Sequence, residues 1–495
     1  MTAKKSKKGK KARKPARKVA KAPARKTRKA APKKTKKSSV TVSAKKRSKT
    51  VKAKKSSRTR VKAKKSSKTA VKAKKSRKTT VKAKKSRKST VHAHKIHSSK
   101  GKTHKKVFKA PATPKSATKE LVPVLDLERY EVKKVAEQGV KDTFFGSTRY
   151  AWIGSGQCGG RLVKSFYDLG YHKAIAVNTT SHDLDLLEIP ASQKFLMDIG
   201  KKGAGKDMSR GLKAAGQFRQ DILHMARKTF GTEVDHIMVC FGAGGGTGGG
   251  SAAELVDMAK DYARSIGKTD PNKAVGVIMT LPTGGEANSP QVARNANRVA
   301  VELGEMAARG QISPLIIVDN EKISRMYPGK TVREFWPSIN NTIAGMFDIF
   351  NRLSSLNSPY TTFDPTDYQS IVNAGGCAIM GLTKVDNYKD RFAISSAVKQ
   401  NLEKTLLSNG FDLSTAKVAG CAFVGGKRLM ANTPNLQDNI NYAFDVLADI
   451  TGNATVHRGI YEDGRETLRV YTIIGGLEFP SSRVDELTAD QLVTV

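Results

Sequence analysis

A glycine-rich stretch from Phe241 to Ser251, FGAGGGTGGGS, constrains the fold of this chain more than any other feature. Seven of its eleven residues are glycine, it follows an apolar run at 236–240, and it precedes a helix-like run at 252–263. Glycine lets the backbone adopt positive φ angles and approach a ligand closely. The N-terminus of the following helix offers unpaired N–H groups and a positive dipole end to an anion. This position favours a phosphate-binding loop over a flexible linker.

Strand and helix patterns alternate from residue 150 onward, as in a doubly wound α/β domain. The expected strands are residues 150–153, 174–178, 236–240, 274–281 and 315–318, and a run at 195–198 leads into a loop rich in Gly and Lys. A short helical lead-in is expected at 121–145, and a long helix from Val332 to about Leu356. The fold class is therefore α/β, and residues 357–482 are expected to form a second α+β domain.

Two familiar nucleotide motifs compete in this region. Gly154-x-Gly156-x-x-Gly159 after a strand matches the dinucleotide fingerprint, but the next strand ends in Asn178-Thr179 where an acid should bind the ribose. Gly200-x-x-x-x-Gly205-Lys206 nearly matches a Walker A loop, but Asp207 replaces the Ser or Thr that would bind magnesium. Both interpretations are disfavoured.

The ordered set of glycine loops resembles the tubulin/FtsZ family from about Tyr150 to Phe479. GSGQCGG at 154–160 looks like the first nucleotide loop, and GGGTGGG at 244–250 like the family signature. TLPTGGE at 280–286 is similar to the ribose loop, VDNEKI at 318–323 to the run before the central helix, and FDPTDYQSIVNAGGCAIMG at 363–381 to the catalytic loop of FtsZ and its trailing strand. The order and spacing of these motifs are more specific than any one of them.

The resemblance implies a GTP/GDP site, with Mg²⁺ held through phosphates and water. The residues expected to contact the nucleotide are Gly154, Ser155, Gly156, Gln157, Cys158, Asn178, Thr179, Gly203, Ala204, Gly205, Gly244, Gly245, Gly246, Thr247, Gly248, Gly249, Glu286, Arg294, Asn320, Asn340 and Asn341. It also implies a GTP-binding domain at 149–331, a central helix at 332–356, an activating and polymerising domain at 357–482 and a short C-terminal tail at 483–495, after a lead-in at 120–148.

Asp364 and Asp367 are the catalytic candidates, because hydrolysis needs a group that orients water at the γ-phosphate. The resemblance places these acids on the opposite side of the subunit from the glycine loops, so they would reach a phosphate only on a neighbouring subunit. That arrangement implies an open, head-to-tail filament of a cytoskeletal GTPase. The alternative is ordinary turn and helix-cap duty, which suits both residues.

The sequence also departs from the FtsZ pattern. Thr362 stands where FtsZ usually has Asn, Asn341 stands where it has Asp, and Pro290 stands where it has Arg, for which Arg294 is the candidate substitute. We expect no long linker or adaptor-binding peptide of the division type after the last strand. A role in cell division is therefore less supported than the nucleotide.

Residues 1–119 form a separate, strongly basic segment. They carry 50 Lys/Arg and no Asp or Glu, whereas the whole chain has 91 and 42, so residues 120–495 hold 41 basic and 42 acidic residues. Blocks beginning at Val51, Val61, Val71 and Val81 repeat VKAKKS every ten residues, with a degraded copy at Val91. The composition looks like the tails of linker histones. We expect a segment that is disordered on its own, because it has little apolar surface to bury.

The ligand expected for this tail is nucleic acid, because dense Lys and Arg release counterions from a polyanion. An anionic membrane, an acidic protein or a tail without a partner remain alternatives. His92, His94, His97 and His104 lack Cys or carboxylate partners, so no metal site is expected. Four scattered cysteines and the lack of an apolar membrane span predict a cytoplasmic protein, associated with the nucleoid if the tail binds DNA.

Three function classes follow. The first is a GTP-hydrolysing, filament-forming protein whose tail ties the polymer to DNA or another polyanion. The second is a GTP-binding regulator without turnover. The third is a histone-like protein that compacts or segregates DNA and uses the GTP-binding body only for oligomerisation.

Overall fold

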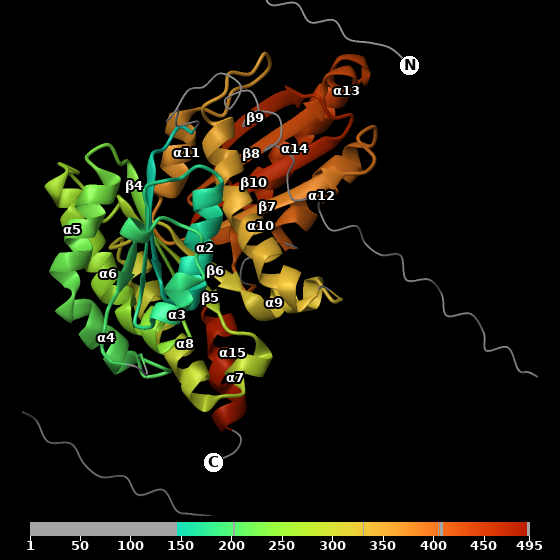
Figure 1. Ribbon diagram of the computed structural model, residues 1–495. Helices are drawn as coiled ribbons and strands as arrows, with labels where there is room; N and C mark the ends of the chain where they lie inside the picture. The colour runs from blue at the N-terminus through green and yellow to red at the C-terminus, as the bar shows by residue number, and fades with distance from the viewer. Residues whose placement is uncertain (1–145, 201–202, 330, 404, 406–408, 493–495) are drawn as a thin grey trace, which may run out of the picture. The chain divides into compact units, whose positions relative to one another are not determined.

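The computed structural model describes residues 146–200, 203–329, 331–403, 405 and 409–492 (Figure 1). The expected basic tail and the expected helical lead-in lie outside the described residues. Within the described part, ten strands form one sheet in the order β3-β2-β1-β4-β5-β6-β7-β10-β8-β9. None of the described helices is long and apolar enough to cross a membrane.

Six parallel strands build the first half of the sheet. They are β1 (Tyr150–Ser155), β2 (Ala174–Asn178), β3 (Lys194–Leu196), β4 (His236–Gly242), β5 (Val275–Leu281) and β6 (Leu315–Asp319). Strands β1, β2, β5 and β6 are buried along their whole length, which explains why they read as continuous apolar runs rather than alternating ones. The strand order runs outward in both directions from β1 and β4, as in a doubly wound sheet. The predicted fold class is confirmed.

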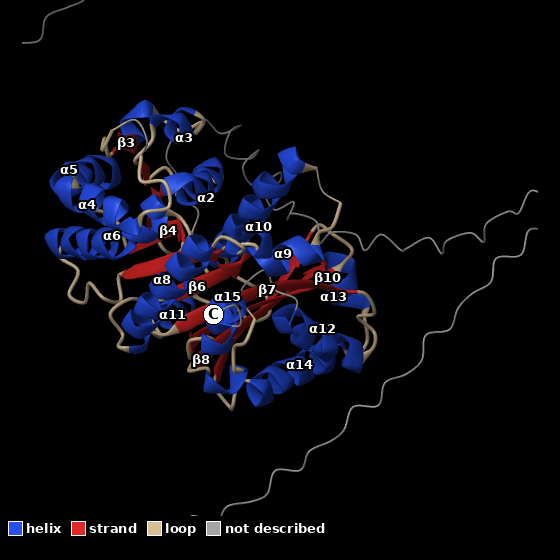
Figure 2. Ribbon diagram, turned by 90° about the horizontal axis from the view of Figure 1, so that it is seen from below, coloured by secondary structure: helices blue, strands red, loops and turns tan. Residues whose placement is uncertain are grey.

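Helices cover both sides of these strands (Figure 2). Helix α2 packs against α3 and α10, whereas α6 packs against α4, α5 and α8. Their bounds are α2 (Gly156–Asp168), α3 (Ser181–Asp185), α4 (Met208–Gln217), α5 (Arg219–Phe230), α6 (Gly246–Ser265), α7 (Gly284–Ala287), α8 (Pro290–Ala308), α9 (Asn320–Met326) and α10 (Val332–Leu353), with a short 3₁₀ turn at Ala191–Gln193.

The second half of the sheet consists of β7 (Cys377–Val385), β8 (Val418–Gly426), β9 (Thr455–Asp463) and β10 (Leu468–Leu477). Strand β10 is antiparallel to β7 and β8, and β9 forms the edge parallel to β8. The helices of this half are α11 (Pro365–Val372), α12 (Arg391–Glu403), α13 (Lys427–Asn432) and α14 (Leu436–Ile450), with a 3₁₀ turn at Leu413–Thr415. A single residue pair, Leu315 with Cys377, joins the two halves of the sheet. The predicted domain boundaries stay predictions.

The long helix α10 is fixed to the first half by aromatic and polar contacts. Phe347 lies edge-on to Trp152 and Phe166, which stack on each other at 3.4 Å between ring centroids. The fully buried Asn351 accepts a hydrogen bond from Thr148 N at 2.8 Å and donates to Thr148 O at 3.0 Å. These contacts hold α10 in one position along β1 and α2.

Two boundaries differ from the sequence expectation in ways that concern the site. Helix α6 begins at Gly246, six residues before the expected start, because its first turns pack closely on backbone and leave no room for side chains. Most of the segment predicted as a short C-terminal tail forms helix α15 (Ser481–Leu492), which begins two residues before that predicted boundary. Its Arg483 makes two hydrogen bonds to the buried Asp319, at 2.7 and 3.0 Å, where strand β6 ends.

Candidate functional site

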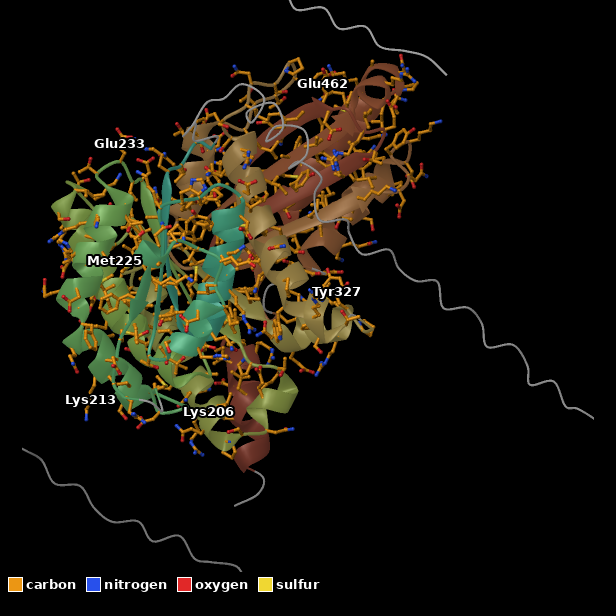
Figure 3. The ribbon with its side chains drawn as sticks, viewed as in Figure 1. Lys206, Lys213, Met225, Glu233, Tyr327 and Glu462 are labelled. Atoms are coloured by element: carbon orange, nitrogen blue, oxygen red, sulfur yellow. The ribbon has the colours of Figure 1, made fainter. Side chains whose placement is uncertain are left out.

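A cavity of about 450 Å³ opens at the carboxyl ends of β1, β2, β4, β5 and β6. This is the place where the strand order switches between β1 and β4, at which doubly wound sheets bind ligands. Its volume lies in the range of roughly 300–1,000 Å³ that small-molecule sites occupy. Lys206, one of the lining residues, marks the cavity at the lower end of the molecule in Figure 3.

Most residues that the sequence predicts to contact a nucleotide line this cavity. They are Ser155, Gly156, Gln157, Cys158, Asn178, Thr179, Gly205, Gly244, Gly245, Gly246, Thr247, Gly248, Glu286, Asn320 and Asn340. They come from seven separate chain segments, six of which follow strands β1 to β6, while the seventh is helix α10.

The N-termini of helices α2 and α6 meet in the wall of the cavity. Their N-cap residues, Ser155 and Gly245, make no side-chain capping hydrogen bond. Gly156 has a φ of +69°, and a Cβ placed on it would lie 3.2 Å from the backbone nitrogen of Gly248. Two helix starts with uncapped first turns therefore face one space. That arrangement attracts an anion, through the N–H groups of the first helical turns and the helix dipoles.

Two threonine hydroxyls connect the loop after β2 to the glycine-rich start of helix α6. Thr179 Oγ1 lies 2.6 Å from Thr247 Oγ1, and it accepts a hydrogen bond from Ala204 N at 3.0 Å. Ala204 and Gly203, which the sequence assigned to the nucleotide, lie outside the cavity lining. Ala204 instead holds Thr179 in place.

Asp183 joins three side chains at one edge of the cavity. Its carboxylate accepts hydrogen bonds from Gln157 Nε2 at 2.9 Å, Asn178 Nδ2 at 3.1 Å and Thr180 Oγ1 at 3.0 Å. Asn178 Oδ1 in turn accepts from Thr179 N at 2.8 Å. This network fixes the amide side chains of Gln157 and Asn178.

Glu286 lies on the short helix α7, at another edge of the cavity. It forms a capping box with Thr283, donating its backbone N–H to the Thr283 hydroxyl at 3.3 Å and accepting from Thr283 N at 2.9 Å. Glu321 accepts a hydrogen bond from Gly284 N at 2.6 Å, which ties α7 to helix α9. Asn320, the first residue of α9, lines the cavity beside this junction.

Cys158 is the one cysteine that reaches the cavity. Its Sγ lies 3.2 Å from Thr280 Oγ1, and burial raises the pKa of the thiol, so the side chain is neutral at physiological pH. A neutral thiol fits a packing and hydrogen-bonding role rather than a nucleophilic one.

The central helix contributes Asn340, which is 8% exposed, and Trp336 one turn earlier. Asn341, the second residue of the expected guanine pair, is exposed and lies outside the lining. Successive residues of a helix point about 100° apart, so the face of α10 that presents Asn340 to the cavity turns Asn341 away from it.

Three further predicted residues also lie outside the lining. Arg294 is exposed on α8, and its nearest polar partner is Gln291 at 3.5 Å. Gly154 and Gly249 are buried packing positions, where a Cβ would lie 2.4 Å from Gly159 O and 2.6 Å from Ala243 O. These glycines allow close packing of the loops without facing the cavity.

Sequence reasoning missed ten lining residues: Arg161, Thr180, Asp183, Lys206, Gly242, Ala243, Thr280, Pro282, Val292 and Trp336. Spacing could have found two of them. Arg161 lies little more than one helical turn after Gln157, and Trp336 lies four residues before Asn340.

Asp364 is the N-cap of helix α11 and Asp367 lies in its first turn. The label of α11 stands at the upper end of Figure 1, away from the cavity. They form a capping box, in which Asp364 Oδ1 accepts from Asp367 N at 2.9 Å and Asp367 Oδ2 accepts from Asp364 N at 3.0 Å. Neither residue lines the cavity. Both acids therefore cap helix α11, as the alternative interpretation expected, and this capping is compatible with a further role in hydrolysis.

Residues 149–328, which contain the strands and loops of the cavity, match the model of the tubulin/FtsZ family GTPase domain. Residues 149–328 are a GTPase domain of the tubulin/FtsZ type. The predicted enzyme class, a GTPase, is confirmed, and guanine nucleotide is supported as the ligand of the GTPase domain.

The chain is similar to whole proteins of this kind. It is 24% identical over 366 residues to cell division protein FtsZ 2 of Haloferax volcanii, which is 71% of this chain and 82% of that protein. It is 26% identical over 343 residues to the tubulin-like protein CetZ of Pyrococcus abyssi, which is 68% of this chain and 87% of that protein.

Two solved structures share the fold. A GTPγS-form protofilament of TubZ from Bacillus thuringiensis serovar israelensis has a TM-score of 0.62 and 19% identity, over 74% of this chain and 96% of that one. A GTPγS-bound protofilament of CetZ2 from Haloferax volcanii has a TM-score of 0.55 and 21% identity, over 70% and 98%. The GTPase domain thus sits in a complete tubulin/FtsZ-like fold.

Proposed function

We propose that this protein binds and hydrolyses GTP in the cavity and assembles head to tail, so that Asp364 and Asp367 of one subunit complete the site of the next. The observation that carries the proposal is the separation between the cavity and the two acids within one subunit. The cavity offers helix N-termini for phosphates, while the two acids lie at the other end of the subunit. A contact that brings unlike ends together repeats without closing and generates a filament.

Guanine is the base that suits the central-helix side of the cavity. Asn340 and Asn320 each carry an amide that can both donate and accept, as the edge of guanine requires. Trp336 adds an aromatic ring of the kind on which bases stack. Adenine would leave buried amide groups unpaired, at about 1–3 kcal/mol for each group.

The phosphates would bind at the side of the cavity opposite the central helix, where α2 and α6 begin. Lys206 and Arg161 add positive charge to the lining. Within the described residues, no group of three or more His, Cys, Asp or Glu side chains is arranged to hold a metal ion. We propose that Mg²⁺ is held by phosphates and water, where it would neutralise phosphate charge.

GTP turnover at increasing protein concentration tests the shared site. We expect turnover per subunit to rise steeply where sedimentation with GTP shows polymer, and sedimentation with GDP or without nucleotide to give less polymer. Turnover per subunit that stays constant down to monomeric dilution would contradict the inter-subunit site. A protein that binds GTP with no turnover at any concentration would instead be the GTP-binding regulator.

The basic tail supports a second part of the proposal, binding of the filament to nucleic acid along the nucleoid. Fifty positive charges without an acid in 119 residues would contact phosphates without reading sequence. Contact with on the order of ten phosphates makes log affinity fall with log salt at a slope of roughly −9.

Fluorescence anisotropy of labelled duplex DNA, with the full chain and a chain lacking residues 1–119, measures this binding across a salt series. Equal affinity of both chains, or a slope near zero, would remove the nucleic-acid proposal. Binding of the full chain to anionic vesicles instead of DNA would assign the tail to a membrane. DNA compaction that needs the tail but no GTP turnover would favour the histone-like alternative, and a role in cell division stays a prediction.

A further inference from the structure

We infer that His457, on the edge strand β9, is a positioning residue for GTP hydrolysis that holds the carboxylate of Asp367. This inference rests on the proposed catalytic role of Asp367. His457 belongs to none of the motifs that the sequence singles out, and it lies 90 residues from Asp367 along the chain.

The contacts of Asp367 are the first observation. His457 Nδ1 lies 2.6 Å from Asp367 Oδ1, and Asp367 Oδ2 accepts the backbone N–H of Asp364 at 3.0 Å. Each carboxylate oxygen therefore has one partner, from a different chain segment. Both side chains are about one fifth exposed, so the pair is accessible from outside the subunit.

The proton on His457 Nδ1 follows from the chemistry of its partner. A carboxylate only accepts hydrogen bonds, so Nδ1 must be the donor. On the other side of the ring, Nε2 lies 3.0 Å from Ser370 Oγ. Ser370 Oγ also lies 2.7 Å from Asp367 O, so its single proton is donated either to that carbonyl or to Nε2. The imidazole is thus held at both nitrogens by residues of helix α11.

Close packing of α11 on the sheet makes these contacts possible. A Cβ on Gly475 of β10 would lie 2.5 Å from Ile371 O, and one on Gly420 of β8 would lie 2.8 Å from Ile371 Cδ1. Gly420 is the residue of β8 that pairs with His457. The glycines of β8 and β10 therefore let α11 pack closely on the sheet, so that His457 can contact the carboxylate of Asp367.

The same face of β9 also holds the backbone before α11. His457 and Tyr461 are four residues apart in the strand, so their side chains share a face. Tyr461 OH accepts from Phe363 N at 2.9 Å and donates to Phe363 O at 3.1 Å, and burial raises the pKa of Tyr461 to about 12, which keeps its proton in place. Strand β9 thus fixes both the start of the acid loop and one of its carboxylates.

The test compares His457→Leu with His457→Asn in the full chain. Leu removes the donor, whereas the amide nitrogen of Asn occupies nearly the place of Nδ1 and keeps it. We expect His457→Leu to lower kcat per polymerised subunit roughly 10- to 100-fold, because a misplaced group costs rate in this range. The KM for GTP should stay within about twofold, since binding and chemistry lie at opposite ends. His457→Asn should recover most of the lost rate.

Arg458→Leu is the matched control, because Arg458 is the next residue of β9, exposed and on its other face. Should His457→Leu fail to fold, His457→Ala removes the same donor without adding an apolar side chain. An unchanged kcat in His457→Leu, or a His457→Asn variant no faster than His457→Leu, would overturn the inference. Wild-type turnover in Asp367→Ala would instead overturn the proposed function on which it rests.

Discussion

The two ends of the subunit are built from different parts of the polypeptide. At the cavity end, the ligand-facing surface is largely backbone, from two uncapped helix N-termini and the glycines around them. At the α11 end, the surface is made of side chains, with two carboxylates held by each other's backbone and by β9. The cavity end depends on glycines, which have no side chain to block the approach to the backbone. The α11 end depends on side chains that come from distant segments of the chain.

This difference has a consequence for how each end responds to substitution. A backbone site is destroyed by adding an atom, because the surrounding backbone cannot move away cheaply. A side-chain site is weakened by removing a group, and the cost depends on how well another group can replace it. The following variants test that contrast.

The largest effect is expected for Gly246→Ala. The added Cβ would lie 2.6 Å from Gly205 O and 2.8 Å from Asp207 N, both backbone atoms, so the loop before α4 must shift away from α6. We expect GTP binding to fall below detection in titration calorimetry. Gly216→Ala in α4 is the control, because its Cβ would meet nothing within 4 Å. Wild-type affinity of Gly246→Ala would show that the cavity does not depend on this backbone approach.

Asp364→Ala is expected to show the next largest effect, on turnover rather than binding. Loss of a group that orients or activates water costs about 10²- to 10⁴-fold in rate. GTP affinity should be unchanged, because Asp364 does not line the cavity. The change also removes the N-cap of α11, at about 1 kcal/mol. Asp364→Asn keeps a capping side chain, so it separates the two effects in single-turnover and thermal-unfolding measurements. Full activity of Asp364→Asn would leave only the capping role.

A smaller effect, on base selectivity, is expected for Asn340→Ala. Loss of one buried amide should weaken GTP binding by about 1–3 kcal/mol and leave ATP binding nearly unchanged. Its neighbour is the matched control, because Asn341 is exposed and outside the cavity lining. Competition binding with GTP and ATP measures both variants. An Asn341→Ala variant that loses selectivity as strongly as Asn340→Ala would break the assignment of the central-helix wall.

The smallest effect is expected for Lys206→Ala. Lys206 is a side chain in a mainly backbone site, and an exposed ion pair contributes about 1 kcal/mol or less. We therefore expect GTP affinity to fall by up to about fivefold, with a smaller change for GDP. Lys213 lies on α4 at the same end of the molecule in Figure 3 but outside the lining, so Lys213→Ala is the control. A loss of a hundredfold or more in Lys206→Ala would place the phosphate contacts on side chains instead.

The sequence by itself determined the α/β class, most strands, the glycine loops and the order in which they follow the strands. These features depend on neighbours along the chain. Apolar runs identify buried strands, and glycine clusters mark places where the backbone must turn or approach another group. The parallel sheet then gathers the carboxyl ends of its strands at one edge, where most of the residues predicted to contact the nucleotide line the cavity.

Only the tertiary structure decided which side chains of those segments face a shared space. Asn340 lines the cavity while Asn341 does not, because the angle of α10 is set by packing against β1 and α2. Asp183, on helix α3, and Lys206, in the loop before α4, also enter the lining. His457 meets Ser370 across 87 residues of chain, through glycines that lower α11 onto the sheet. Local sequence encodes conformation, but contacts between distant segments depend on how the whole sheet and its helices pack.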